Sequence, residues 1–273
     1  SAMKKTKILD VQFDVCTKNE AIERIMDILE NRAHESGKQI ATPNPEMLLE
    51  AQKNADFKTV LNKSWLNIPD GIGILWAGTF NEITKKSSGL NRAFKMIFSL
   101  LGLAVYPKFC TKVFPERLTG VDLMESICAI SKGIPIFLLG ARPGIAEKVK
   151  TFLETKYKGI NIAGVFSGSP SEYDFTAIQA SIAEAQPKIL FVAYGSPNQE
   201  LWIAHHLHEL KSVKIAMGVG GAFDFLAGER KRAPKWMQRL GLEWLFRLIQ
   251  EPSRIKRIYN ATIKFPLKIL QQR

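Results

Sequence analysis

The chain has 273 residues, of which 46% are hydrophobic and 23% charged. This composition excludes a disordered protein and allows one large domain or two small ones. The net charge of +12 indicates an anionic partner, such as a phosphate compound, nucleic acid or an acidic membrane surface. The cysteines Cys16, Cys110 and Cys128 lack metal-ligand spacing and fit reduced thiols in a cytosolic protein. The longest uncharged apolar run, 96–106, is shorter than the roughly 20 residues that span a bilayer.

Predicted strands and helices alternate along most of the chain. Residues 8–15 alternate as in one strand, and 18–35 have the spacing of an amphipathic helix. Further strands are predicted at 38–42, 65–69, 135–139, 160–166, 188–194 and 213–219. Further helices are predicted at 45–54, 71–79, 120–132, 143–156, 174–185 and 197–210. This order predicts an α/β fold, with a mainly parallel, Rossmann-like sheet and helices on both faces.

Two regions depart from this alternation. Residues 84–114 place basic residues around an apolar centre, which favours either an interfacial amphipathic helix or a helical hairpin packed on the core or on a second subunit. Residues 235–273 contain nine Lys or Arg and two Glu, a surplus of seven positive charges. We therefore expect an α/β body over 1–230 and a basic helical appendage over 231–273. A solvated basic helix is the alternative interpretation of the appendage.

Polar residues follow two of the predicted strands, at the sheet edge where α/β proteins bind ligands. Asp70 lies between Pro69 and Gly71, where a carboxylate is a candidate general base, although an Asx-turn or helix cap is the alternative. Thr42 and Asn44 flank Pro43. They are candidate ligand contacts, and helix capping is again the alternative.

Three more loops have the composition of ligand-binding segments. Arg117 precedes a predicted helix start, where a guanidinium can pair with a phosphate or form a surface salt bridge. Gln199 and Glu200 open the helix after the loop 194–197. Complementing the helix dipole is a sufficient alternative role for Glu200, whereas Gln199 indicates sugar or base recognition. The glycine-containing loop 140–144 favours a phosphate, but lacks the full dinucleotide-binding pattern.

Metal binding is not expected. His205, His206 and His208 are too close in sequence for all three to face one ion from a helix. The chain also lacks an Asp-x-Asp pair, a Gly-x-Ser-x-Gly elbow and a P-loop, which argues against hydrolases of that type and NTPases.

Arginines recur in the appendage. Arg247, Arg254 and Arg257 have offsets of seven and three, which can place guanidinium groups along one helical face. With Lys256 they are candidates for a clamp on a diphosphate, a leaving group or an acidic headgroup.

Taken in order, these loops resemble the WecG/TagA/CpsF family of bacterial glycosyltransferases. The resemblance runs from about Ile8 to Arg257. Its motifs are TPNPE at 42–46, PDGIG at 69–73, RLTGVDL at 117–123, LLGA at 138–141, YGSPNQELW at 194–202, GVGGAFDFLAG at 218–228, RAP at 232–234 and EWLFRLIQEPSRIKR at 243–257. The segment 84–114 is longer than the equivalent connection in typical teichoic acid members of the family. That departure leaves the acceptor, the membrane contact and the oligomeric state open.

The resemblance implies an inverting, metal-independent transfer of a sugar, N-acetylmannosamine above all, from a UDP-sugar to a polyprenyl-diphosphate-linked GlcNAc in cell-surface polymer synthesis. By motif, Asp70 matches the catalytic base. The arginines 247, 254 and 257 match those of a mobile appendage that closes over the site. The matching substrate contacts are Thr42, Asn44, Arg117 and Gln199, and the same loops contain Thr119, Gly140, Ala141, Tyr194, Gly195 and Glu200.

The resemblance also implies a peripheral protein on the inner face of the cytoplasmic membrane, with an anionic lipid surface as partner, no cofactor and no nucleic acid. A homo-oligomer away from the membrane is a further possibility. The alternatives are another donor sugar (mannosyl, glucosyl or N-acetylmannosaminuronic acid) for capsule or exopolysaccharide, a nicotinamide-dependent oxidoreductase, or a basic nucleic-acid-binding or scaffold protein.

Overall fold

The computed structural model describes residues 3–31, 37–229, 231, 233–240, 242–252 and 255–272. Six parallel strands form the central sheet in the order β4-β3-β8-β7-β5-β6. The strands of this sheet are β3 (Lys38–Ala41), β4 (Leu66–Asn67), β5 (Pro135–Gly140), β6 (Asn161–Phe166), β7 (Ile189–Ala193) and β8 (Ile215–Gly218). All strands point the same way, so their carboxyl ends meet at one edge of the sheet. The predicted α/β class and parallel sheet are confirmed.

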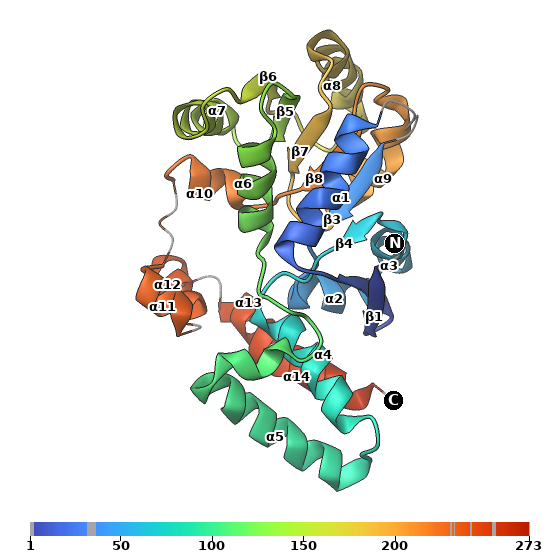
Figure 1. Cartoon of the computed structure of the whole chain (residues 1–273), viewed down its shortest axis with the longest axis vertical. Helices are drawn as coiled ribbons and strands as arrows, with labels where there is room; N and C mark the ends of the chain where they lie inside the picture. Colours follow the sequence, from blue (N-terminus) through green and yellow to red (C-terminus); the bar gives the residue numbers. More distant parts are fainter. Residues whose placement is uncertain are drawn as a thin grey trace.

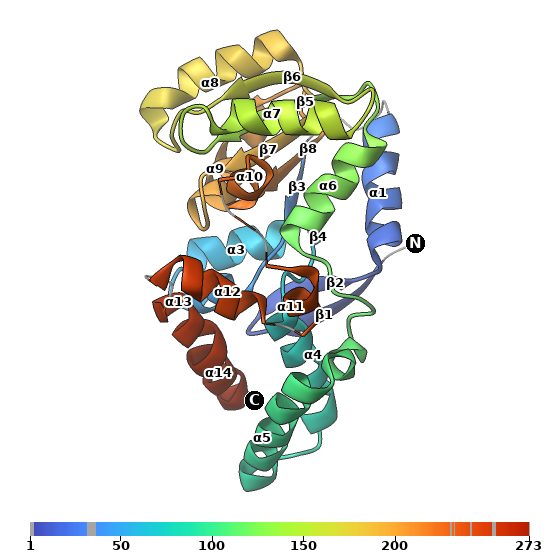
Figure 2. The same cartoon turned by 90° about the vertical axis from the view of Figure 1, so that its left-hand side faces the viewer.

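Helices cover both faces of the sheet (Figures 1 and 2). Along β5, Ile136 and Leu138 pack on one face, whereas Phe137 and Leu139 pack on the other. Because successive side chains of a strand point to opposite faces, a strand buried on both sides is continuously apolar. The first face is covered by α1 (Lys18–Glu30), α6 (Gly120–Ile130) and α7 (Ile145–Lys156), and the second by α8 (Glu172–Ala185) and α9 (Asn198–His206). Two short helices follow α9 and β8: the 3-10 turn η2 (Leu207–Glu209) and α10 (Ala222–Leu226).

The predicted first strand, 8–15, is only partly correct. Its residues 11–15 form β2 (Val11–Val15), but a turn separates them from β1 (Lys4–Ile8), and the two strands form a separate antiparallel hairpin. Its turn residues Leu9 and Asp10 have φ values of 48° and 62°, in the left-handed region that two-residue hairpin turns require. Glycine or asparagine usually marks such a turn in the sequence, and this one has neither.

A third hydrophobic cluster lies below the sheet edge and includes the end of the chain. It combines the hairpin with α2 (Pro45–Ala51), α3 (Ala55–Lys63), α4 (Ile72–Thr84) and α14 (Phe265–Gln271). Phe265 and Ile269 of α14 are fully buried in it, and α14 contacts α2 and α5 (Gly89–Val105). Residues 55–63, for which no element was predicted, form α3. Part of the predicted appendage therefore belongs to the core of the body.

The rest of the appendage consists of short helices. They are α11 (Lys235–Arg239), α12 (Glu243–Gln250), α13 (Ile255–Tyr259) and a π-helical turn, η4 (Asn260–Lys264), that continues into α14. Figure 2 shows α13 next to α12, with α14 leading down from it. In this region η4 contacts α2, and α14 contacts α5.

The segment 84–114 forms one long helix, α5 (Gly89–Val105), and a 3-10 turn, η1 (Pro107–Thr111), which fold back on α4. Arg92 anchors α5 to α14 by donating to the carbonyl oxygens of Ile269, at 3.1 Å, and Gln272. The outer face of α5 is apolar and exposed at Leu90, Phe94, Ile97, Phe98 and Leu101.

Among the residues that the structure describes, no helix combines the length and the apolar character needed to cross a membrane.

Candidate active site

A cavity of about 660 Å³ opens at the carboxyl edge of the sheet. The loops after β3, β4, β7 and β8 contribute to its lining, together with the start of α6 and the segment α13–η4. Ten of the candidate residues chosen from the sequence line it: Thr42, Asn44, Asp70, Arg117, Thr119, Tyr194, Gly195, Gln199, Glu200 and Arg257. Loops separated by more than 100 residues in the sequence therefore form one composite site.

Asp70 lines this cavity, and two backbone interactions hold its main chain. Its N–H donates to the carbonyl oxygen of Pro43 at 3.0 Å, and it forms a parallel bridge with Leu118. Gly71, with φ of 89°, takes the N-cap position of α4. Asp70 therefore precedes the N-cap residue of α4, and it lines the cavity.

The amino end of α6 approaches Asp70 closely because residue 120 is glycine. A Cβ atom at Gly120 would lie 2.9 Å from the Thr42 Oγ1 and 3.7 Å from the Asp70 Oδ2. A carboxylate, a hydroxyl and a helix amino end thus share one wall. Helix amino ends have a partial positive charge and favour anions.

Two candidate residues also cap helices. Asn44 caps α2, with Oδ1 accepting from the N–H of Met47 at 3.0 Å; the cap uses the oxygen only. Thr119 caps α6, accepting from the N–H of Asp122 at 3.1 Å and donating to the Asp122 carboxylate at 2.7 Å. The capping alternative therefore holds for Asn44, and Thr119 is a cap that the sequence analysis did not predict. Both residues also line the cavity.

Gln199 is a buried residue whose side chain connects two loops of the site by hydrogen bonds. Its Oε1 accepts from the N–H of Gly195 at 3.1 Å and of Gly220 at 2.9 Å, which joins the loop after β7 to the loop after β8. Its Nε2 donates to Glu200 at 2.8 Å. A Cβ atom at Gly218 would lie 2.7 Å from the Gln199 amide nitrogen, so only glycine leaves room for this side chain.

Glu200 is almost completely buried, with 1% of its surface exposed. Burial raises the pKa of this carboxyl, and hydrogen bonds from Gln199 and Ser196 act in the opposite direction. A backbone hydrogen bond to Glu200 also lowers the pKa, but the net direction is upward because removal of the charged form from water outweighs these hydrogen bonds.

The appendage reaches the cavity through Arg257. Its Nε donates to the Oε2 of Glu46 at 2.9 Å, which joins α13 to the first turn of α2. Sequence reasoning missed Glu46 as a site residue, although it ends the motif TPNPE. The side chain of Arg247 and all of Arg254 lie outside the described part of the chain.

Gly140 and Ala141 lie outside the lining of this cavity. Gly140 has φ of 99°, and a Cβ atom there would lie 2.9 Å from the carbonyl carbon of Ala193. Ala141 donates its N–H to the carbonyl oxygen of Ala193 at 3.0 Å. In this structure both residues connect the ends of neighbouring strands.

Comparisons with known proteins match most of the chain to one family model and to similar proteins. The family model described as "Glycosyl transferase WecG/TagA/CpsF family" matches residues 6–93 and 89–273. A protein of Bacillus subtilis (strain 168), named N-acetylglucosaminyldiphosphoundecaprenol N-acetyl-beta-D-mannosaminyltransferase, is 33% identical over 238 residues, covering 86% of this chain and 80% of that protein. A protein of the same name from Bacillus spizizenii (strain ATCC 23059 / NRRL B-14472 / W23) is 32% identical over 226 residues, covering 82% and 76%.

Proposed function

Because the chain belongs to the WecG/TagA/CpsF family of glycosyl transferases, we propose that it transfers N-acetylmannosamine from a UDP-linked donor to a polyprenyl-diphosphate-linked GlcNAc. The observation that carries this proposal is the cavity in which Asp70, Thr42, the start of α6 and two arginines meet. The Bacillus relatives, named for that acceptor and that sugar, support the choice of substrates.

In the proposed reaction, Asp70 is the general base. A hydroxyl oxygen of the acceptor sugar forms a bond to the anomeric carbon of the donor while the bond from that carbon to the UDP oxygen breaks. Asp70 takes the proton of the attacking hydroxyl, and the sugar is transferred with inversion. A positioned base of this kind contributes roughly 10²–10⁴-fold to the rate.

The departing UDP gains negative charge, which positive groups in the cavity must stabilise. Arg117 and Arg257 line the cavity, and the amino end of α6 adds a partial positive charge. We assign this role to these groups, with Arg247 and Arg254 as further candidates from the appendage, and propose that transfer does not depend on a metal ion.

We further propose that the protein works at the inner face of the cytoplasmic membrane, where a polyprenyl acceptor is held. The exposed apolar side chains Phe94 and Phe98 of α5 and Tyr259 of α13, together with the surplus of basic residues, support contact with an anionic lipid surface. We also propose that the protein forms a homo-oligomer when it is away from the membrane. Its subunit interface would bury the same exposed apolar side chains.

The experiment is a panel of UDP-sugars, each assayed for UDP release with and without a lipid-diphosphate-GlcNAc analogue. The proposal expects acceptor-dependent release with UDP-N-acetylmannosamine. Acceptor-dependent release with a mannosyl, glucosyl or N-acetylmannosaminuronic acid donor instead would support the same mechanism, but in the synthesis of a different polymer. No acceptor-dependent release from any donor in the presence of membranes would contradict the proposal.

A further inference from the structure

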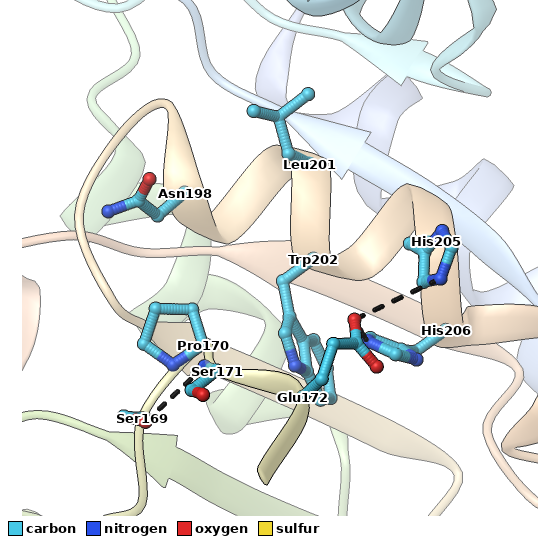
Figure 3. Close-up of a pocket in the computed structure, with 9 residues that line it drawn as sticks. All are labelled: Ser169, Pro170, Ser171, Glu172, Asn198, Leu201, Trp202, His205 and His206. Carbon is cyan, nitrogen blue, oxygen red and sulfur yellow. Dashed lines mark hydrogen bonds and ion pairs between the residues drawn. The ribbon is translucent and has the colours of Figure 1, made fainter. Parts of the chain in front are cut away.

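A second cavity, of about 640 Å³, lies between the amino end of α8 and the face of α9 that carries Trp202 and His206 (Figure 3). Among the residues that the structure describes, none lines both this cavity and the Asp70 cavity. We propose that Glu172, His205 and His206 bind a divalent transition-metal ion here, with Zn²⁺ as the reference ion.

The three side chains converge although they come from two elements. One potential ligand atom of each lies within 4.8 Å of the other two. The Oε1 of Glu172 is 3.3 Å from the Nε2 of His206 and 4.0 Å from the Nε2 of His205. Ligand atoms about 2.0–2.2 Å from a tetrahedral zinc ion lie roughly 3.3 Å apart. The pair Glu172–His206 already has this spacing, and His205 is exposed and can approach by rotation of its side chain.

The sequence argued against a metal site because one of the three ligands, Glu172, comes from a different helix than the histidines. From one helix, His205, His206 and His208 do not converge, and His208 is absent from the cluster. Glu172 instead comes from the first turn of α8, 33 residues earlier than His205 in the chain.

His206 is held in the orientation that a metal ligand needs. It is only 2% exposed, stacks on Phe175 with ring centroids 3.8 Å apart and packs against Trp202. Its Nδ1 lies 3.4 Å from the Oε1 of Glu209. A proton on Nδ1 directed at Glu209 leaves the lone pair of Nε2 directed at Glu172. Carboxylates orient metal-binding histidines in this way.

The chemistry of the three groups selects the class of ion. Two imidazoles and one carboxylate suit zinc and neighbouring transition metals, whereas Mg²⁺ and Ca²⁺ prefer oxygen ligands. Glu172 and His205 are about 70% exposed, so an ion can enter from solvent and water can complete its coordination. Ser169, Ser171 and Asn198 also line this cavity and offer polar partners to such a water.

The ion would join the start of α8 to the end of α9. The opposite end of α9 carries Gln199 and Glu200 of the Asp70 cavity. We therefore propose that the ion stabilises the packing of α9 against α8 and takes no part in the transfer step. Because this inference does not depend on the proposed reaction, either can fail alone.

The test is titration of the tag-free, metal-stripped full chain with Zn²⁺ by calorimetry, with Co²⁺ and its visible absorption as a second probe. The proposal expects one ion per chain and a higher melting temperature with Zn²⁺. His205→Ala and Glu172→Gln, both at exposed positions, should each weaken binding at least tenfold, and Glu209→Gln should weaken it 10–100-fold. His208→Ala is the matched control and should bind like the wild type.

Three results would overturn the proposal. The first is the absence of Zn²⁺ binding by the wild type. The second is binding of equal strength by the double variant of Glu172→Gln and His205→Ala, which would mark adventitious association. The third is a melting temperature that responds to pH through these residues but not to Zn²⁺, which would reduce the cluster to a histidine–carboxylate ion pair.

Discussion

At the scale of single residues, Gln199 was chosen from the sequence as a group that recognises a sugar or a base. In the structure, its side-chain oxygen accepts from the N–H groups of Gly195 and Gly220, and its amide nitrogen donates to Glu200. Recognition of a sugar or a base by Gln199 stays a prediction. The contact with Gly220 could not be predicted, because Gly220 is 21 residues away in the sequence and the contact depends on how the strands are ordered.

Replacing Gln199 by Ala should therefore affect stability as well as activity. Two backbone N–H groups lose their shared acceptor, and a buried donor without a partner costs about 1–3 kcal/mol. We expect the free energy of unfolding, measured by urea denaturation, to fall by at least about 1 kcal/mol. Asn198→Ala, at the exposed neighbouring position, should change it by less than about 0.5 kcal/mol. Equal values for the two variants would contradict the role of Gln199 in connecting the two loops.

Glu200 should make stability depend on pH. Burial raises its pKa in the folded state, so between the unfolded and folded pKa values the native state holds a proton that the unfolded state has released. The contribution of Glu200 is therefore fully present below the unfolded pKa and is lost as pH rises through the folded pKa. We expect wild type to lose stability relative to Glu200→Gln as pH rises, by at most about 1.4 kcal/mol per pH unit.

The measurement is parallel chemical denaturation of the two proteins between pH 4 and pH 9. The difference between them isolates Glu200 from the other titrating groups. A difference that does not change with pH, or that favours wild type increasingly at high pH, would show that the folded pKa is not raised.

At the scale of elements, the continuous apolar strands made the sheet predictable, because a strand covered on both faces contains few polar residues. Connections between elements were harder. The turn at Leu9 and Asp10 has no glycine. Residues 55–63 form α3 behind an Asn54 cap that accepts from the N–H of Phe57 at 3.0 Å, although the sequence analysis assigned them no element. Glu172 meets His206 only because α8 and α9 cover the same face of the sheet.

The approach of α6 to the site yields a prediction at this scale. Gly120→Ala would place a methyl group 2.9 Å from the Thr42 Oγ1, so α6 or Thr42 must move. We expect kcat/KM for UDP release to fall about tenfold or more, because misplacement by about 1 Å costs up to about 10²-fold, while the chain stays folded by circular dichroism.

The matched control is Gly102→Ala in α5, where an added Cβ would meet a single atom at 3.9 Å. This helix interior gains from alanine by roughly 0.5–1 kcal/mol, so stability should rise slightly and activity should be unchanged. Full activity of Gly120→Ala would show that the spacing between α6 and Thr42 does not matter for catalysis.

At the scale of the whole molecule, the C-terminal region is both a wall of the site and part of the core. The prediction of a separate appendage over 231–273 rested on its surplus of positive charge. Charge describes the exposed face of a helix and says little about its buried face, and α14 buries Phe265 and Ile269 completely. Deletion of the whole appendage would therefore expose core surface and is a poor test of its role in catalysis.

Phe265→Ala tests this packing directly. Removing a fully buried phenylalanine costs about 3–5 kcal/mol, and we expect the free energy of unfolding to fall by that amount. Leu267→Ala, two residues along the same helix and 52% exposed, should change it by less than about 0.5 kcal/mol. A small effect of Phe265→Ala, read from urea denaturation, would mean that the appendage does detach from the body.

The central claim is that Asp70 is the base in a glycosyl transfer to a lipid-linked acceptor. The most direct measurement is acceptor-dependent UDP release from UDP-N-acetylmannosamine by wild type and Asp70→Asn, with folding of the variant checked by its melting temperature. The account predicts a loss of kcat of roughly 10²–10⁴-fold in a folded variant. A folded Asp70→Asn variant with the kcat of wild type would contradict it.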